Sequence, residues 1–266
     1  MILLRAVLVA VALAACGLVA EPSPEIRLNT AGPQATARAA VPGSGAGVVV
    51  FTFDDALRAQ LDAARMLETH GYRGTFYVST GQLRSTYSWA NYASETEIRS
   101  LARRGHDVQS HTISHANLPT LPAAELEEEL RGAKAVVERL SGRPVGHLAY
   151  PYGAHDDRVV AMAQRFYQTG RGSGADHPRF WPEVLESSDP FRIPALAVTA
   201  AMSLQQVERY VDLALRDDGR LILVFHGLHA DPAGFDWSPE RFAGLVDYVA
   251  RRDARVRTMS ELFGPH

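Results

Sequence analysis

The sequence predicts a parallel α/β fold with barrel-like closure, and two observations support this prediction. Segments with strand-like composition alternate with segments of helical periodicity throughout residues 47–266. Polar residues suited to catalysis also follow the predicted strands, where parallel α/β folds place their chemistry. They are Asp54, Asp55, His111, Tyr152 and His226. None of them contributes to the strand prediction, so the agreement is independent support.

The individual elements follow from local patterns. Val48–Phe53 is a nearly continuous apolar run, typical of a buried parallel strand. Ser94 begins a helix with a capping box, because Glu97 stands three residues later. Strands are predicted at residues 48–53, 74–79, 106–110, 146–150, 191–198 and 220–225, with a short one near Val256. Helices are predicted at residues 57–69, 94–105, 123–140, 156–167, 203–215 and 239–251.

The predicted helix at 123–140 has a graded charge pattern. Glu127, Glu128 and Glu129 lie near its start, and Arg139 lies near its end. This order of charges complements the helix macrodipole. We therefore interpret the three glutamates as a solvated face.

Residues 1–15 have the pattern of a lipoprotein signal peptide. Residues 6–15 are all Ala, Val or Leu, which is too short an apolar run to span a bilayer but suits a signal sequence. The segment Leu13-Ala14-Ala15-Cys16 has the form of a bacterial lipobox, so we expect lipidation at Cys16. The alternatives are an ordinary secretory signal with a chance cysteine and an uncleaved membrane helix.

Three regions follow from this interpretation. Residues 1–15 are the signal peptide, residues 16–46 are the lipidated cysteine and a flexible tether rich in Pro, Ala, Gly, Ser and Thr, and residues 47–266 are one large domain. We expect an exported monomer, anchored to the membrane by lipid, in the outer membrane or periplasm if the cell has two membranes. Cys16 is the single cysteine, so no disulfide is available. A net charge of −3 without a basic tract argues against a nucleic-acid partner.

Two groups of residues suggest a metal centre. Asp54 and Asp55 are adjacent carboxylates at the end of a buried strand, where desolvation and mutual repulsion favour a bound cation or proton. His111 and His115 are four residues apart, close enough to reach one ion. Two histidines and one aspartate suit a hydrolytic zinc or a similar divalent ion.

Several motifs occur together in a characteristic order. They are Thr52-Phe53-Asp54-Asp55, Gly74-Thr75-Phe76-Tyr77-Val78, His111-Thr112-Ile113-Ser114-His115, Pro151-Tyr152-Gly153 and Leu221-Ile222-Leu223-Val224-Phe225-His226. Together they resemble the NodB-homology polysaccharide deacetylases, the fourth family of carbohydrate esterases. The resemblance covers residues 47–260. It implies a distorted (β/α) barrel that carries a metal-dependent N-deacetylase site.

The resemblance also implies a role for each motif residue. Asp55, His111 and His115 would hold one divalent ion, with Zn²⁺ expected and Co²⁺ or Ni²⁺ as alternatives. Asp54 would be the general base, and His226 the general acid that protonates the leaving amine. The backbone N–H of Tyr152 would help to hold the oxyanion.

The sequence departs from the family pattern around the base. Many relatives have an arginine two residues before the proline of the third motif, where this chain has Ala149. The acidic motif with a tryptophan that holds this arginine is not recognisable either. Some members that act on exported polysaccharides share the Tyr-Pro-Tyr-Gly loop. What orients Asp54 is therefore open at this point. A smaller departure is Ala56, where glycine is commonest.

Other residues are candidates for substrate contact. Pro151 and Tyr152 lie in the third motif, and Trp89 and Trp237 lie in predicted loops from which an aromatic ring can stack on a sugar. His229, three residues after His226, is a further candidate, and the sequence favours neither a position in the cleft nor one outside it. His147 and His155 are expected to be structural or exposed.

We hypothesise a metal-dependent hydrolase that removes N-acetyl groups from a cell-envelope or exported polysaccharide containing N-acetylglucosamine. One alternative is an O-acetyl esterase acting on a glycan such as xylan, which needs the same site. Another is a glycan-binding lipoprotein that has lost turnover. Ala149 is the residue that keeps this last alternative open.

Overall fold

The computed structural model describes residues 47–86, 91–173 and 189–264, all within the compact unit Gly43–His266. The predicted signal peptide, Cys16, the tether and Trp89 lie outside the described residues. No helix in the described ranges is long and apolar enough to cross a bilayer.

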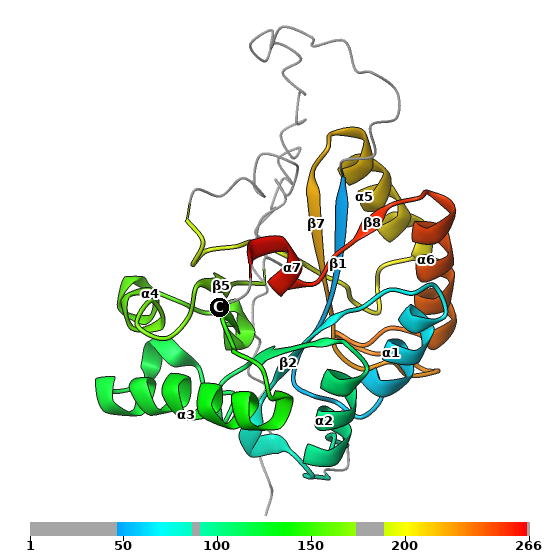
Figure 1. The fold of residues 1–266 in the computed structure, drawn as a ribbon. Helices are drawn as coiled ribbons and strands as arrows, with labels where there is room; N and C mark the ends of the chain where they lie inside the picture. The colour runs from blue at the N-terminus through cyan, green and yellow to red at the C-terminus, as the bar shows by residue number, and fades with distance from the viewer. Residues whose placement is uncertain (1–46, 87–90, 174–188, 265–266) are drawn as a thin grey trace, which may run out of the picture. The chain divides into compact units, whose positions relative to one another are not determined.

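A sheet of eight strands forms the centre of the unit, and every pairing in it is parallel (Figure 1). Its order is β5-β4-β3-β2-β1-β7-β6, and β8 also pairs with β1. The strands are β1 (Val48–Phe53), β2 (Thr75–Val78), β3 (Asp107–Ser110), β4 (His147–Ala149), β5 (Thr169–Arg171), β6 (Leu196–Ala197), β7 (Arg220–Phe225) and β8 (Arg255–Val256). All-parallel sheets are normally covered on both faces, which explains the apolar runs of β1 and β7.

Helices between the strands cover the outside of the sheet (Figure 1). They are α1 (Gln60–Glu68), α2 (Glu95–Arg103), α3 (Ala123–Ser141), α4 (Asp157–Ala163), α5 (Leu204–Arg216) and α6 (Pro239–Arg251). Helix α7 (Met259–Phe263) follows β8 instead, and its Met259 belongs to one cluster with Val50 of β1 and Tyr77 of β2. The capping box predicted at Ser94 is present, because Glu97 N–H donates to Ser94 Oγ and the Glu97 carboxylate accepts from Ser94 N–H.

The alternation of side chains along β1 divides the core into two parts. Val49, Phe51 and Phe53 belong to the large cluster packed with the helices, where the aromatic rings of β1, β7 and α6 meet. Val50 belongs to a smaller inner cluster with Tyr77 and Ala149, among others. Because successive residues alternate, Asp54 continues the inner row of β1.

The sheet curls until its two edges share one segment of chain. Residues 190–193 pair beside β5, with Gly172 N–H donating to the Ile193 carbonyl at 2.9 Å. Three residues later, Leu196 is the register partner of Leu223 in β7. The architecture is therefore a distorted, curled (β/α) barrel, as the sequence predicted.

The structure differs from the predicted elements in three places, one of which is α7, a helix of five residues that was not predicted. The predicted strand 191–198 is reduced to Leu196–Ala197, because the preceding residues pair with the opposite edge. Strand β5 was not predicted, since Thr169-Gly170-Arg171 has no apolar pattern. Its three residues are nevertheless buried, and β5 supplies a residue of the site.

Candidate active site

The candidate site lies where the carboxyl ends of β1, β3, β4 and β7 meet. Five non-glycine residues in the loops that follow these strands have a left-handed backbone, a conformation that costs about 1–2 kcal/mol for each residue. They are Asp55, Ala56, Thr112, His115 and Tyr152, with φ between 59° and 78°. Such strain persists only where surrounding contacts hold it, and it is concentrated at functional sites.

Asp55, His111 and His115 form a compact cluster that can hold a metal ion. One ligand atom from each lies within 4.8 Å of the others. Asp55 Oδ1 is 3.3 Å from His111 Nε2 and 3.2 Å from His115 Nε2. This oxygen is buried and lacks a partner with hydrogen-bond geometry among the described residues. A buried carboxylate oxygen facing two imidazole nitrogens fits a divalent cation, as the sequence predicted.

The strand beside His111 orients its ring toward the cluster. Its Nδ1 lies 2.8 Å from the Ala149 carbonyl oxygen, so Nδ1–H donates and Nε2 is left to coordinate. The His111 side chain is almost completely buried. Burial lowers its pKa, but the carboxylates of Asp54 and Asp55 outweigh burial and raise the pKa above its usual value.

The loop that carries His115 is held by a residue of α3. The Glu129 carboxylate accepts from the N–H of Ile113 at 2.8 Å and from the N–H and hydroxyl of Ser114 at 2.9 and 2.6 Å. Our interpretation of this glutamate as part of a solvated face was wrong. Glu128 faces solvent and pairs with Arg131, and Glu127 pairs with Arg165, so the sequence pattern did not distinguish the three.

Asp54 is paired with an arginine that the sequence analysis did not identify. Arg171, at the end of β5, donates from Nη2 to Asp54 Oδ1 at 2.5 Å, and both side chains are buried. The Arg171 guanidinium also lies over the Tyr77 ring, 4.8 Å from its centroid. Burial raises the pKa of Asp54, but Arg171, His111 and His226 outweigh burial and lower it below its usual value. Asp54 is therefore ionised at neutral pH, as a general base must be.

The position of Arg171 explains the alanine in the third motif. Ala149 of β4 and Arg171 of β5 are register partners, so their side chains occupy neighbouring places on the same face of the sheet. The guanidinium reaches Asp54 from the strand next to the one that carries it in many relatives. The one available signal was an arginine four residues after a predicted helix, which is too common to single out.

His226 directly follows β7, which pairs with β1 on the side away from β2. Asp54 N–H donates to the Phe225 carbonyl at 3.0 Å, which continues the β1–β7 ladder to the site. The Gln60 amide then donates to the carbonyls of both Asp54 and His226, which ties the two strand ends together. His226 Nδ1 is buried and has no hydrogen-bond partner among the described residues.

Tyr152 lies beside His115 in a tight turn after β4. Its ring is 69% exposed and its centroid is 4.6 Å from that of His115. The left-handed backbone of Tyr152, with φ 59°, turns the chain sharply at this point. Pro151 is buried and begins the turn, so it supports Tyr152 from below. His155 stacks on Tyr150 and contacts the Gly153 carbonyl through Nδ1, a structural role as expected.

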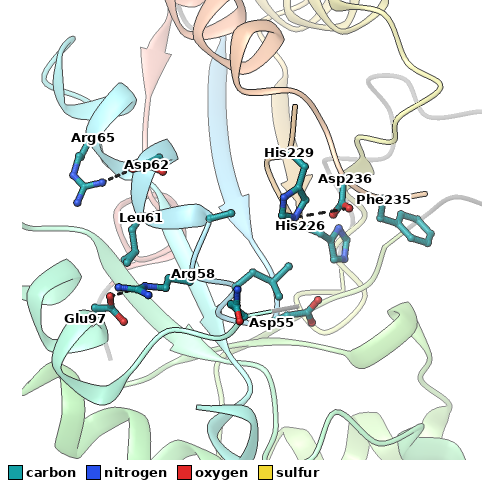
Figure 2. A pocket seen from close by; sticks show the side chains of 13 residues that line it. Asp55, Arg58, Leu61, Asp62, Arg65, Glu97, His226, His229, Phe235 and Asp236 are labelled. Carbon is teal, nitrogen blue, oxygen red and sulfur yellow. Dashed lines mark hydrogen bonds and ion pairs between the residues drawn. The ribbon is translucent and has the colours of Figure 1, made fainter. Parts of the chain in front are cut away.

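The remaining candidates fall in different places. Trp237 is completely buried, and its indole N–H donates to the Met202 carbonyl. Its ring therefore packs in the core, which corrects the expectation that it contacts a sugar. His147 is buried against Thr169, as expected of a structural residue. His229 lines a groove that Asp55 and His226 also line, so of the two positions that the sequence left open it occupies the one facing the cleft (Figure 2).

The fold and the site together define a curled (β/α) barrel with a candidate metal centre at the carboxyl ends of its strands. The family model described as polysaccharide deacetylase matches residues 43–169. Among curated relatives, the chitooligosaccharide deacetylase of Bradyrhizobium sp. (strain ANU 289) is 29% identical over 146 residues, covering 52% of this chain and 60% of the relative. Over several other curated relatives, the match spans less than half of the relative's length.

Solved structures of similar fold include two polysaccharide deacetylases. BC0361, a polysaccharide deacetylase from Bacillus cereus, is 26% identical with a TM-score of 0.52, covering 61% of this chain and 50% of that one. The Bc1960 peptidoglycan N-acetylglucosamine deacetylase is 17% identical with a TM-score of 0.57, covering 84% of this chain and 90% of that one, and it supports the fold alone. These matches support a polysaccharide deacetylase domain in this chain.

Proposed function

We propose that this chain is a metal-dependent deacetylase that removes N-acetyl groups from a cell-envelope or exported polysaccharide containing N-acetylglucosamine. The observation that carries the proposal is the Asp55–His111–His115 cluster, with Asp54 and His226 beside it. The lipobox at Cys16 adds export and a lipid anchor to the proposal, which would place the enzyme near envelope polysaccharides.

The residues of the cluster fit a divalent cation. One carboxylate and two imidazoles leave room for water and substrate, the arrangement of hydrolytic zinc sites. A divalent ion bound there would polarise the amide carbonyl and make water a better nucleophile. Zn²⁺ is the ion we propose, with Co²⁺ or Ni²⁺ as substitutes.

The protein's own groups supply the proton transfers. Asp54, held ionised by Arg171, would take a proton from the attacking water. His226 lies at the groove and would give a proton to the nitrogen as the carbon–nitrogen bond breaks. The turn at Tyr152 would direct a backbone N–H toward the oxygen on which charge develops.

The intact base and its cation favour an enzyme over a binding protein. Ala149 kept that alternative open, because the usual arginine is missing from the third motif. Arg171 provides the same positive charge at Asp54 from β5. This contact is the reason to propose turnover rather than binding alone.

The test is acetate release by the full-length chain from N-acetylglucosamine oligomers. We expect release after Zn²⁺ or Co²⁺ is supplied, and its loss after treatment with a chelator. The Asp54→Asn variant should retain metal and lose turnover, whereas His111→Ala should lose metal. A protein that binds no metal and releases no acetate with either ion would contradict the proposal.

A further inference from the structure

The hydrogen-bond ladder between β1 and β7 ends at two of the candidate catalytic residues. Phe53 and Phe225 are the last register partners of the two strands, so the same register places Asp54 beside His226. Asp54 N–H still donates to the Phe225 carbonyl at 3.0 Å. Register partners in neighbouring strands point to the same face of a sheet, with the strands about 4.8 Å apart. The distance between the proposed base and the proposed acid therefore depends on how the two main chains are held at this point.

The next hydrogen bond of the ladder is replaced by a different contact. In a regular parallel pair, the Gly227 N–H would donate to the Asp54 carbonyl. It donates instead to the Asp236 carboxylate at 3.0 Å. The chain after Asp54 also leaves the strand, because Asp55 and Ala56 have φ values of 78° and 67°. The Asp54 carbonyl therefore needs a donor from outside the two strands, since an unpaired buried carbonyl is costly.

Gln60, the first residue of α1, provides this donor and serves His226 as well. Its side-chain amide donates from Nε2 to the carbonyl of Asp54 and, at 3.2 Å, to the carbonyl of His226. A primary amide has two N–H donors, one for each carbonyl. Gln60 is only 1% exposed, so water does not compete for these hydrogen bonds. One side chain thus connects the main chain of the proposed base to that of the proposed acid.

The loop that leads to Gln60 is itself anchored to the chain before α2. Arg58 N–H donates to the Asn91 carbonyl at 2.8 Å, and Ala93 N–H donates to the Ala56 carbonyl at 2.9 Å. These two hydrogen bonds hold the loop on either side of Leu57. The Gln60 amide therefore has a fixed position from which to hold the two carbonyls.

From these contacts we propose that Gln60 is a positioning residue that sets the distance between the proposed base, Asp54, and the proposed acid, His226. The inference rests on the proposed function and adds a residue to its machinery. Gln60 is not among the residues that line the groove, so it acts through the two main chains and not by contact with substrate. Both proton transfers act on one substrate, and a misplacement of about 1 Å can reduce a rate about 100-fold.

Hydrogen exchange of the full-length chain tests this connection without requiring turnover. Gln60→Leu removes both donors and keeps a side chain of similar size. We expect backbone amides in residues 55–59 and 226–229 to exchange about tenfold faster in this variant, while β4 and β5 keep their wild-type rates. Gln60→Asn, which keeps an amide on a shorter side chain, should show the same pattern at smaller size. Unchanged exchange in both segments, or an equal increase throughout the sheet, overturns the proposal.

Thr75→Val is the matched control for the loss of buried hydrogen bonds. Thr75 is completely buried at the start of β2, where its hydroxyl donates to the Asp107 carboxylate at 3.1 Å and accepts from Met259 N–H at 2.9 Å. These contacts lie at the amino ends of the strands, away from the site. We expect Thr75→Val to lower stability in urea, as Gln60→Leu does, and to retain wild-type turnover and wild-type exchange in residues 55–59 and 226–229. Effects there as large as those of Gln60→Leu would assign the change to lost stability and contradict the proposal.

Steady-state kinetics with Zn²⁺ separate positioning from substrate binding. In Gln60→Leu we expect kcat for N-acetylglucosamine oligomers to fall about tenfold or more, with KM and metal content unchanged, and Gln60→Asn should recover part of kcat. In the double variant Gln60→Leu/His226→Ala, the loss should be smaller than the product of the two single losses, because both changes affect one unit. A loss equal to that product contradicts an action through His226.

Failure of this inference is distinguishable from failure of the proposed function. Acetate release with the wild-type kcat in a folded Gln60→Leu variant contradicts the role of Gln60 and supports the deacetylase. Faster exchange confined to residues 55–59 and 226–229, without acetate release by the wild-type chain under any metal condition, supports Gln60 as the connection and contradicts the deacetylase.

Discussion

Arg171 Nη2 and Asp54 Oδ1 lie 2.5 Å apart in the interior of the barrel, although the two residues are 117 positions apart in the chain. A carboxylate buried this deeply is stable as an anion only with a partner, because desolvation alone favours its protonated form. The planar guanidinium donates hydrogen bonds in fixed directions, so it holds Asp54 Oδ1 in one place. Asp54 Oδ2 then faces His111, whose Nε2 is 4.0 Å away. We therefore regard Arg171 as the positioning residue for the proposed base.

Loss of the guanidinium should reduce turnover without loss of metal. In Arg171→Ala we expect kcat to fall about 100-fold, because Asp54 is no longer fixed, while metal content and KM change little. Removal of one member of a buried pair also destabilises the fold by about 3–5 kcal/mol. Acetate release, metal analysis and urea unfolding measure the three effects. Full activity in this variant would show that Asp54 does not depend on the arginine.

Moving the arginine from position 171 to position 149 separates its effect on Asp54 from its effect on the stability of the fold. Because Ala149 and Arg171 are register partners, an arginine side chain at position 149 would leave the sheet beside position 171, on the same face. The double variant Ala149→Arg/Arg171→Ala should recover part of the activity lost in Arg171→Ala, whereas Ala149→Arg alone adds a second buried cation and should be unstable. No recovery in a folded double variant would contradict an equivalent role for the two positions.

The contact between Glu129 and the His115 loop should control metal affinity. Glu129→Gln removes the negative charge that accepts three hydrogen bonds from Ile113 and Ser114. We expect metal affinity to fall about 10–100-fold, as for other residues that orient metal ligands. Glu128→Gln is the matched control, because Glu128 is next to Glu129 in the chain but its carboxylate pairs with Arg131 in solvent. Competition with a chromophoric chelator measures both, and equal affinities in the two variants would contradict the assignment.

His226 should matter more for amides than for esters. An amine leaves only after protonation, whereas an alkoxide or phenolate leaves more readily without an acid. In His226→Ala we expect acetate release from N-acetylglucosamine oligomers to fall about 100-fold or more, with a smaller loss for an aryl acetate. Metal content should be unchanged. Equal losses for the two substrates would argue against His226 as the acid.

Stability should decrease as the pH falls below about 6.5, in part because of His106. Its Nδ1 accepts from Gly74 N–H at 3.1 Å, so the ring proton is on Nε2, which faces Glu68 at 2.9 Å. Burial lowers the pKa of His106 more than Glu68 raises it. As the pH falls, His106 therefore binds a proton in the unfolded chain before it does so in the folded chain. The stability that this residue contributes above pH 6.5 is lost between pH 6.5 and the lower pKa of the folded state.

Urea unfolding between pH 7.5 and 5 measures this effect. His106→Gln should show a shallower dependence on pH than the wild-type chain, at the cost of lower stability at pH 7.5. The control is His70→Gln, because His70 is partly exposed and pairs with Asp247 at the surface. If His106→Gln retains the full pH dependence, other groups are responsible for it.

The site could be predicted from sequence where its residues lie next to a strand with a clear pattern. Asp54 and Asp55 end an apolar run, and His226 ends another, so their convergence follows from the parallel sheet alone. The pair His111 and His115 was identified by its spacing. The strained loops that bring these residues into contact carry no pattern of their own.

The parts that escaped prediction depend on contacts distant in sequence. Arg171 lies in a strand of three residues without apolar periodicity, and its burial depends on Asp54 and Tyr77. Glu129 is distinguished from Glu127 and Glu128 only by the loop that it faces. Trp237 and Phe235 are two residues apart in one loop, and only the hydrogen bonds of Gly227, Asp236 and Trp237 determine which ring is buried.

Because β5 lies late in the chain, a gene fusion or truncation can separate Arg171 from the motifs that precede it. The region that matches the family model ends at residue 169, two residues before Arg171. A gene fragment that ended there would encode the three proposed metal ligands and the proposed base, yet it would lack Arg171, the counter-ion of Asp54, and also β7 and His226. Recombination at that boundary would thus transmit a recognisable motif set with a defective centre. In this chain, the unit that must be inherited whole extends at least to the second edge of the barrel.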